Sequence, residues 1–174
     1  MVKPHMTSEA VITEMRPGDW EAVRTIYAEG IATRLATFEV EAPSWEAWDA
    51  AHLSFARLVA RKGKIVVGWA ALSPVSRRHA YAGVAEVSVY VAQDLRGTGV
   101  GRQLLEALIA QSEQHGIWSL QAVMFPENAG SVALHSGCGF REGGRRERIG
   151  KLDGAWRDTM LLERRSQRIG TDQT

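Results

Sequence analysis

The sequence contains a single cysteine, Cys138, among its 174 residues. One cysteine cannot form an internal disulfide, and low cysteine content is typical of proteins from a reducing compartment. No apolar run approaches the roughly 20 residues that a helix needs to span a bilayer. The first residues, MVKPHMTSEA, lack the apolar segment of a secretory signal peptide. From these absences we expect a cytoplasmic protein that has no membrane partner.

Strong charge of either sign is also missing. Lysine and arginine total 21, aspartate and glutamate total 20, and the formal net charge at pH 7 is +1. This balance argues against nucleic acid as an obligatory partner. Metal ligands at a recognisable spacing are missing as well, because Cys138 stands alone and the histidines are scattered. We therefore expect no metal site at His5, His52, His79, His115 or His135.

A chain of 174 residues is long enough for one domain with a buried core. Hydrophobic residues make up 45% of it and charged residues 24%, which is ordinary for a globular protein. Neither a repeat nor a linker rich in proline, glycine or serine divides it. We expect a single domain with a core over about residues 10–163, followed by a polar, flexible tail from Glu163 to Thr174.

Hydrophobic periodicity predicts an α/β fold with one mixed sheet. Runs rich in β-branched residues predict strands, and apolar residues at helical spacing predict helices. Asp19 and Ser44 are the expected N-caps of the first two helices. The order β-α-α-β-β-β-α-β-α-β-β places helices on both faces of the sheet. The expected strands are 10–15, 58–61, 65–70, 84–91, 117–124, 140–149 and 155–162, and the expected helices are 20–32, a segment after Ser44, a segment ending near 115, and 128–136.

The stretch from Val84 to Leu108 has the features of an anion site. An expected strand, Val84–Val91, leads through a short polar connection to Arg96-Gly97-Thr98-Gly99-Val100-Gly101, which opens a helix. Glycines allow positive φ, and the first N–H groups of a helix attract negative charge. The turn lacks the Gly-Lys-Ser/Thr ending of a P-loop and the G-x-G-x-x-G spacing of a dinucleotide fingerprint. A different phosphate ligand and a glycine turn without any ligand both stay open.

Glu86 interrupts an otherwise apolar or small-residue strand segment, Val84-Ala85-Glu86-Val87-Ser88-Val89. A carboxylate there is costly to bury without a task or a partner, and burial raises its pKa toward the range of a general base. A solvent-facing position in an alternating strand is the alternative interpretation.

Together these residues resemble the GCN5-related N-acetyltransferases. Arg96-x-x-Gly99-x-Gly101 is similar to the pyrophosphate loop of that superfamily, and the segment from Asn128 to Phe140 resembles its second motif. The chain resembles one branch of the superfamily more closely, over about residues 10–162. This is the phosphinothricin N-acetyltransferase branch, which includes methionine sulfoximine N-acetyltransferases. The resemblance implies the superfamily's fold, with a single, mostly antiparallel sheet, and a homodimer. It rests on Phe38-Glu39, Trp45 to Trp48, Pro74-x-x-x-Arg78-x-Ala80-Tyr81, Glu86-x-Ser88-Val89-Tyr90-Val91, Asn128, Ser131-Val132, Leu134-His135 and Gly154-x-Trp156-x-Asp158.

The resemblance implies acetyl-CoA as the acetyl donor and no metal. The backbone of Val89, Tyr90 and Val91 would bind the pantetheine arm, together with the side chain of Asn128. Read alone, the strand residues are core positions and Asn128 is a helix N-cap. The pyrophosphate would be bound by the glycine-rich turn, namely Arg96, Gly97, Thr98, Gly99, Val100, Gly101 and Arg102.

The resemblance also implies direct acetyl transfer, in a ternary complex, to the α-amine of a small amino acid or analogue. Methionine sulfoximine, methionine sulfone and phosphinothricin are the acceptors it suggests. Glu86 would be the general base, and His135, where the superfamily usually has tyrosine, would protonate the leaving thiolate. A packing role is the alternative for His135, and a solvated basic loop is the alternative for 76–78. The implied acceptor-binding residues are Phe38, Ser76, Arg77, Arg78, Glu86, Val87 and Ser88, with the arginines on a carboxylate.

Two other functions remain as alternatives. An enzyme with the same donor could acetylate a protein N-terminus or an aminoglycoside, and either acceptor would be expected to need an open acidic groove. A non-catalytic acyl-CoA-binding sensor would not need Glu86.

Overall fold

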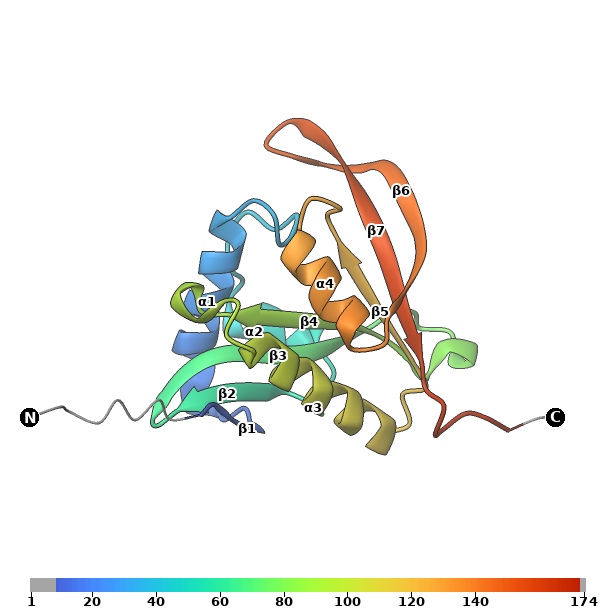
Figure 1. Cartoon of the computed structure of the whole chain (residues 1–174), viewed down its shortest axis with the longest axis horizontal. Helices are drawn as coiled ribbons and strands as arrows, with labels where there is room; N and C mark the ends of the chain where they lie inside the picture. Colours follow the sequence, from blue (N-terminus) through green and yellow to red (C-terminus); the bar gives the residue numbers. More distant parts are fainter. Residues whose placement is uncertain (1–8, 173–174) are drawn as a thin grey trace, which may run out of the picture.

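The computed structural model describes residues 9–172, which form one seven-stranded sheet with helices on both faces (Figure 1). The strand order in the sheet is β1-β2-β3-β4-β5-β7-β6. The strands are β1 (Val11–Glu14), β2 (Leu58–Lys62), β3 (Ile65–Pro74), β4 (Val84–Val91), β5 (Ser119–Met124), β6 (Arg141–Leu152) and β7 (Ala155–Arg165). The helices are α1 (Trp20–Ala32), α2 (Trp45–Ala51), α3 (Val100–Gln114) and α4 (Ala129–Gly137).

Strands β4 and β5 form the parallel pair in an otherwise antiparallel sheet. Their register has three residue pairs and ends at Glu86 opposite Gln121, although both strands continue further. In Figure 1, β1–β4 run across the lower part of the molecule while β5–β7 rise steeply away from them. The sheet is therefore split beyond Glu86.

The paired end of β4 and β5, away from the split, is fastened by Gly83 and Trp118. The carbonyl oxygen of Gly83 accepts hydrogen bonds from the backbone N–H groups of Trp118, at 2.8 Å, and Ser119, at 3.0 Å. A Cβ atom at Gly83 would lie 2.0 Å from the Trp118 ring. Glycine is therefore required where β4 begins to pair with β5.

Alternation along the strands builds a core on each face of the sheet. Leu104 and Leu108 of α3 pack against one face, together with Ala70, Ala85 and Leu120. On the other face, α1 and α2 cover β2 and β3 with a cluster rich in aromatic side chains, made of Val23, Ile26, Trp48, Val59, Trp69 and Ala71. Each large aliphatic side chain buried in this way contributes roughly 1.5–3 kcal/mol to stability.

The predicted element order and mixed sheet are confirmed, and Asp19 lies at the N-cap position of α1 as expected. Ser44 caps α2 as expected, with its hydroxyl accepting from the Ala47 N–H. Asp19 makes no side-chain cap for α1. Its carboxylate instead accepts from the Arg16 N–H at 2.7 Å and pairs with Arg61 of β2 at 2.5 Å. A cationic partner 42 positions away offers this carboxylate a charge-assisted bond that a helix N–H does not.

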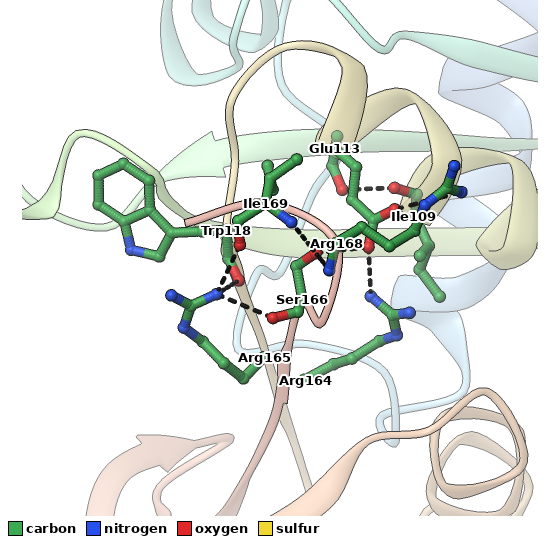
Figure 2. Close-up of polar contacts among 9 residues, drawn as sticks. Ile109, Glu113, Trp118, Arg164, Arg165, Ser166, Arg168 and Ile169 are labelled. Atoms are coloured by element: carbon green, nitrogen blue, oxygen red, sulfur yellow. Dashed lines mark hydrogen bonds and ion pairs between the residues drawn. The ribbon is translucent and has the colours of Figure 1, made fainter. Parts of the chain in front are cut away.

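The tail is ordered further than predicted. Strand β7 extends to Arg165, and the next residue, Ser166, is buried. Figure 2 shows the cause: the Glu113 carboxylate at the end of α3 accepts from the Ser166 hydroxyl at 2.8 Å and from Arg164 at 3.2 Å. Arg165 also donates to the Trp118 carbonyl at 3.1 Å. The polar residues Arg164, Arg165 and Ser166 are therefore held by hydrogen bonds to Glu113 and Trp118.

Candidate active site

A cavity of about 850 Å³ opens where β4 and β5 separate. Its walls come from the end of α1 and the following loop, the outer half of β4, the glycine-rich turn, the end of β5 and α4. Of the predicted site residues, the cavity wall includes Phe38, Glu86, Val87, Ser88, Val89, Tyr90, Val91, Arg96, Gly97, Gly99, Gly101, Arg102, Asn128 and His135.

Glu86 lies in this wall on β4, between Ser73 of β3 and Gln121 of β5 in the sheet register. Burial raises the pKa of its carboxyl above the ordinary value, and hydrogen bonding with Gln121 and the charge of Arg146 offset part of that rise. A half-buried carboxylate with a raised pKa can accept a proton from an ammonium group brought into the cavity.

The glycine-rich turn before α3 has the conformation of an anion site. Gly97 and Gly99 have φ values of +76° and +94°, in the left-handed region that favours glycine. A Cβ atom at either residue would meet nothing within 4 Å, so the space beside the turn is open. Helix α3 begins directly after Gly99, and its first N–H groups have no acceptor within the helix.

The side chains around this turn complete the anion site. Arg102 is exposed and pairs with Glu106 at 2.8 Å, and Arg96 donates to the Val91 carbonyl at 3.3 Å. Thr98 donates to the Leu95 carbonyl at 2.6 Å, and neither it nor the buried Val100 lies in the cavity wall. Two arginines, open glycines and a helix N-terminus fit a diphosphate such as that of coenzyme A.

Asn128 joins the cavity wall to the loop after α1. Its Oδ1 accepts from the Ser131 N–H at 3.2 Å, which caps α4, and its Nδ2 donates to the Leu35 carbonyl at 3.1 Å. One Nδ2 hydrogen remains for a ligand. The N-cap interpretation of Asn128 is confirmed, and its side chain also holds the loop over the cavity.

His135 is buried in the cavity wall, which favours the neutral form of its imidazole. Burial lowers the pKa of its imidazole, although a hydrogen bond with the Ser131 carbonyl acts in the opposite direction. The Nδ1 atom lies 2.8 Å from that carbonyl oxygen, so Nδ1 carries the hydrogen and Nε2 carries a lone pair. This tautomer suits a hydrogen-bond acceptor better than a proton donor for a thiolate.

The predicted acceptor-binding residues are only partly brought together. Phe38 packs edge-on against Phe125 at 4.9 Å, and the β6 backbone at Gly150 comes so close that a Cβ there would lie 2.9 Å from the Phe38 ring. The segment 76–78 is absent from the cavity wall, and the Arg78 guanidinium lies over Tyr81.

Other parts of the site were missed or misplaced by the sequence interpretation. Trp156, one of the residues on which the family resemblance rests, is 56% exposed and does not line the cavity. Gln121 and Thr159 were not predicted as site residues. They reach the face of the sheet that carries Glu86 only through strand pairing, which the sequence does not reveal. In residues 9–172 no group of three or more histidine, cysteine, aspartate or glutamate side chains could hold a metal ion. No helix in that range is both long and apolar enough to cross a bilayer.

The chain is similar to known proteins in sequence and in fold. The model of the acetyltransferase (GNAT) family matches residues 20–140. The chain belongs to this family. It is 36% identical to the phosphinothricin N-acetyltransferase of Alcaligenes faecalis over 159 residues, covering 86% of this chain and 79% of the relative. It is 31% identical to the L-methionine sulfoximine/L-methionine sulfone acetyltransferase of Pseudomonas paraeruginosa over 160 residues, covering 88% and 93%.

A solved GNAT structure shares the fold and contains the donor. The phosphinothricin acetyltransferase of Sinorhizobium meliloti, in complex with acetyl-CoA, superposes with a TM-score of 0.81 at 28% identity, covering 90% of this chain and 88% of that chain. The predicted family and fold are therefore confirmed.

Proposed function

We propose that this GNAT enzyme transfers the acetyl group of acetyl-CoA to the α-amine of a small amino acid or analogue. The observation that carries the proposal is the position of Glu86, a carboxyl with raised pKa at the point where the sheet splits. The relatives named for phosphinothricin and methionine sulfoximine acetylation support an amino-acid acceptor.

The residues around the split would hold the donor as follows. The turn Arg96–Arg102 and the N-terminus of α3 would bind the diphosphate. The edge of β4 at Val89–Val91 that is not paired with β5 would bind the pantetheine arm together with Asn128. Bound acetyl-CoA supplies an activated thioester. The carbonyl carbon of that thioester would lie near the middle of β4, beside Glu86.

Glu86 would make the acceptor nucleophilic. An α-amino group is mostly protonated near neutral pH and then has no lone pair. Glu86 removes the proton, directly or through a water molecule, and the amine nitrogen forms a bond to the carbonyl carbon. A backbone N–H near Val89 stabilises the charge on the carbonyl oxygen. The C–S bond then breaks, and the departing thiolate takes up the second proton that the nitrogen releases as it becomes an amide.

The loop after α1 supports a small-molecule acceptor. This loop is held over the cavity by the bond from Asn128 to the Leu35 carbonyl and by the bond from Arg157 to the Arg34 carbonyl, at 3.2 Å. Phe38 and Phe125 pack together in the wall. These contacts restrict the space available to a polypeptide acceptor.

Release of free thiol from acetyl-CoA, measured across a panel of acceptors, tests the proposal. The panel contains methionine sulfoximine, methionine sulfone, phosphinothricin, proteinogenic amino acids, an N-terminal peptide and an aminoglycoside. We expect the highest kcat/KM with one or more free amino acids or analogues. Turnover confined to the peptide or the aminoglycoside would contradict the proposed acceptor. Binding of acetyl-CoA without turnover on any acceptor would favour a sensor.

We also propose a homodimer, as the family resemblance implies. The β6–β7 hairpin projects beyond the body of the molecule (Figure 1), and Ile149 and Trp156 on it are exposed. A molar mass near 38 kDa by light scattering, twice the 19.2 kDa of one chain, would support this, and a mass of one chain would contradict it.

A further inference from the structure

Strand β7 carries Thr159 into the cavity from the far side of β5. Residues paired directly across neighbouring strands have their side chains on the same face. Glu86 pairs with Gln121, Gln121 pairs with Glu163, and alternation along β7 brings Leu161 and then Thr159 to that face. Thr159 is consequently on the face of the sheet that carries Glu86.

Thr159 has an unpaired polar atom in this wall. The residue is 3% exposed and contributes to the cavity wall, and its Oγ1 has no hydrogen-bond partner among the residues that the structure describes. A buried hydroxyl without a partner costs roughly 1–3 kcal/mol. Such an atom facing a cavity is suited to a hydrogen bond with a ligand.

Arg146 of β6 is paired directly with Thr159 and lies on the same face. Beyond this pair the register slips, because the β6 segment between Arg146 and Gly150 is longer than the β7 segment between Thr159 and Arg157. A bulge of this kind redirects side chains and is common beside active sites.

The bulge is held in place by Asp158. This carboxylate accepts from the Arg148 N–H at 2.8 Å and from the Arg145 Nε at 2.8 Å, and its Oδ2 lies 2.7 Å from another Arg145 nitrogen. Arg145 is thereby committed to Asp158. The Arg146 side chain forms no hydrogen bond or ion pair with any residue in the described range 9–172.

We propose that Arg146 and Thr159 form a subsite that binds an anionic group of the acceptor, on the opposite side of β5 from Glu86. The proposal rests on the proposed function and deepens it by naming the residues that would select an anionic acceptor. The Arg146 guanidinium offers two parallel N–H donors to a carboxylate or phosphinate, and the Thr159 hydroxyl offers a third. A neutral carboxamide in the same place carries no negative charge, so it forms weaker hydrogen bonds with these three donors.

Two further observations support the subsite. The charge of Arg146 reaches Glu86, where it opposes the effect of burial on the pKa of that carboxyl. Arg146 itself is exposed and lies outside the cavity wall, beside Thr159, which lines it. Two other arginines have partners: Arg157 lies over Phe125 at 4.0 Å and pairs with Glu127 at 3.4 Å, and the Arg78 guanidinium lies over Tyr81.

The test compares Arg146→Gln with Arg148→Asn, which removes the same charge two positions away on the same strand. Asn suits the positive φ of 44° at residue 148. We expect Arg146→Gln to lower kcat/KM for anionic acceptors about 10- to 100-fold, as loss of a charged hydrogen bond predicts. The KM for acetyl-CoA is expected to stay unchanged, and so is turnover of the matching carboxamide.

Thr159→Val is the second variant and keeps the shape of the side chain. It should lower kcat/KM for the same acceptors about 3- to 10-fold. Its thermal midpoint should not fall, because the buried hydroxyl that it removes has no partner.

The pattern across acceptors identifies the bound group. Equal losses for methionine, methionine sulfone and glutamate, with methioninamide spared, would place the α-carboxylate at Arg146. Losses confined to glutamate and phosphinothricin would place the side-chain acid there. Equal losses for every acceptor including methioninamide, or the same loss in Arg148→Asn, would overturn the subsite.

A binding measurement separates this proposal from the proposed function. Titration of methionine sulfone and of phosphinothricin into the wild-type protein with coenzyme A, followed by calorimetry, needs no turnover. Weaker binding to Arg146→Gln than to Arg148→Asn would support the subsite even if no acceptor is acetylated. Equal binding to both variants would overturn it even in an active enzyme.

Discussion

Two glutamates of this protein show opposite electrostatic behaviour. Glu86 lies in the cavity wall, where burial raises the pKa of its carboxyl and Gln121 and Arg146 offset only part of the rise. Burial of Glu113 at the end of α3 acts in the same direction. There, however, hydrogen bonds from Ser166 and Arg164 and the charges of Arg164 and Arg168 outweigh it and lower the pKa.

The difference lies in the number of partners and not in the fold. The carboxylate of Glu113 joins α3 to β7 and the segment after it (Figure 2), and its side chain is 9% exposed. Glu86 faces a cavity and has Gln121 as its hydrogen-bond partner, so a change in its protonation disturbs fewer contacts than it would at Glu113. One acid is therefore suited to proton transfer and the other to stability.

The largest expected effect is a loss of turnover on substitution of Glu86. Glu86→Gln keeps the size of the side chain and removes the base, so kcat should fall by about 10²- to 10⁴-fold. Acetyl-CoA binding and the thermal midpoint should be retained, because Glu86 forms no ion pair in the described part of the chain. Thiol release, calorimetry and thermal unfolding measure these three quantities, and undiminished turnover would remove Glu86 from the base role.

Glu113→Gln should produce the reverse pattern. It leaves the charges of Arg164 and Arg168 without their acid, so the free energy of unfolding should fall by about 2 kcal/mol while kcat stays the same. Denaturant unfolding measures the loss. Glu106→Gln is the matched control on the same helix, since its pair with Arg102 is exposed and should matter little. Equal stability of both variants would show that the Glu113 cluster is not stabilising.

The pH dependence should separate the two acids. Glu86 must be ionised to act, so kcat/KM should fall on acidification at a pH above the ordinary carboxyl value of about 4.3. Glu113 has a lowered folded pKa, so its stabilising contribution is fully present above that ordinary value and is lost as pH falls through the lowered pKa. Activity should therefore disappear at a higher pH than the fold.

Rate profiles and thermal unfolding over the same pH range measure this separation. Arg146→Gln should move the acid limb of the rate profile to higher pH, because it removes a charge that favours the ionised form of Glu86. Loss of activity and loss of structure at one common pH would contradict the assignment.

The smallest expected effect concerns Ser166. Its hydroxyl donates to Glu113 at 2.8 Å and accepts from the Arg168 N–H at 3.1 Å, so Ser166→Ala should cost about 1 kcal/mol of stability. The exposed Ser54→Ala is the control and should be neutral. A loss no larger than that of the control would show that Arg164 alone holds Glu113.

Much of the fold could be predicted because its signals are local. The hairpin turn at Gly63, the N-caps Ser44 and Asn128 and the glycine turn before α3 each depend on residues that are close in sequence. Strand alternation then places Glu86 on a defined face of β4. These features are sufficient for the element order and for the expected location of the donor.

The rest depends on side chains that meet across long sequence separations. Asp19 pairs with Arg61 over 42 positions, and Glu113 meets Ser166 over 53. No periodic pattern marks either contact. Arg146 is placed by its pairing with Thr159, beside a bulge that Asp158 holds. In the sequence nothing distinguishes Arg146 from the other arginines of the same strand. The residues on the proposed acceptor side of the cavity were therefore the hardest to predict from the sequence.

Strands β4 and β5 diverge as the two sides of a V, with their last shared pair at the apex. A change in the angle between the two sides moves atoms most at the open end and least at the apex. Glu86 occupies the apex, so its carboxylate should hold nearly the same place whether the gap is narrow or wide. A long, flexible thioester arm could thus enter and leave when the far end of the gap opens. The Glu86 carboxylate would meanwhile stay directed at the same point.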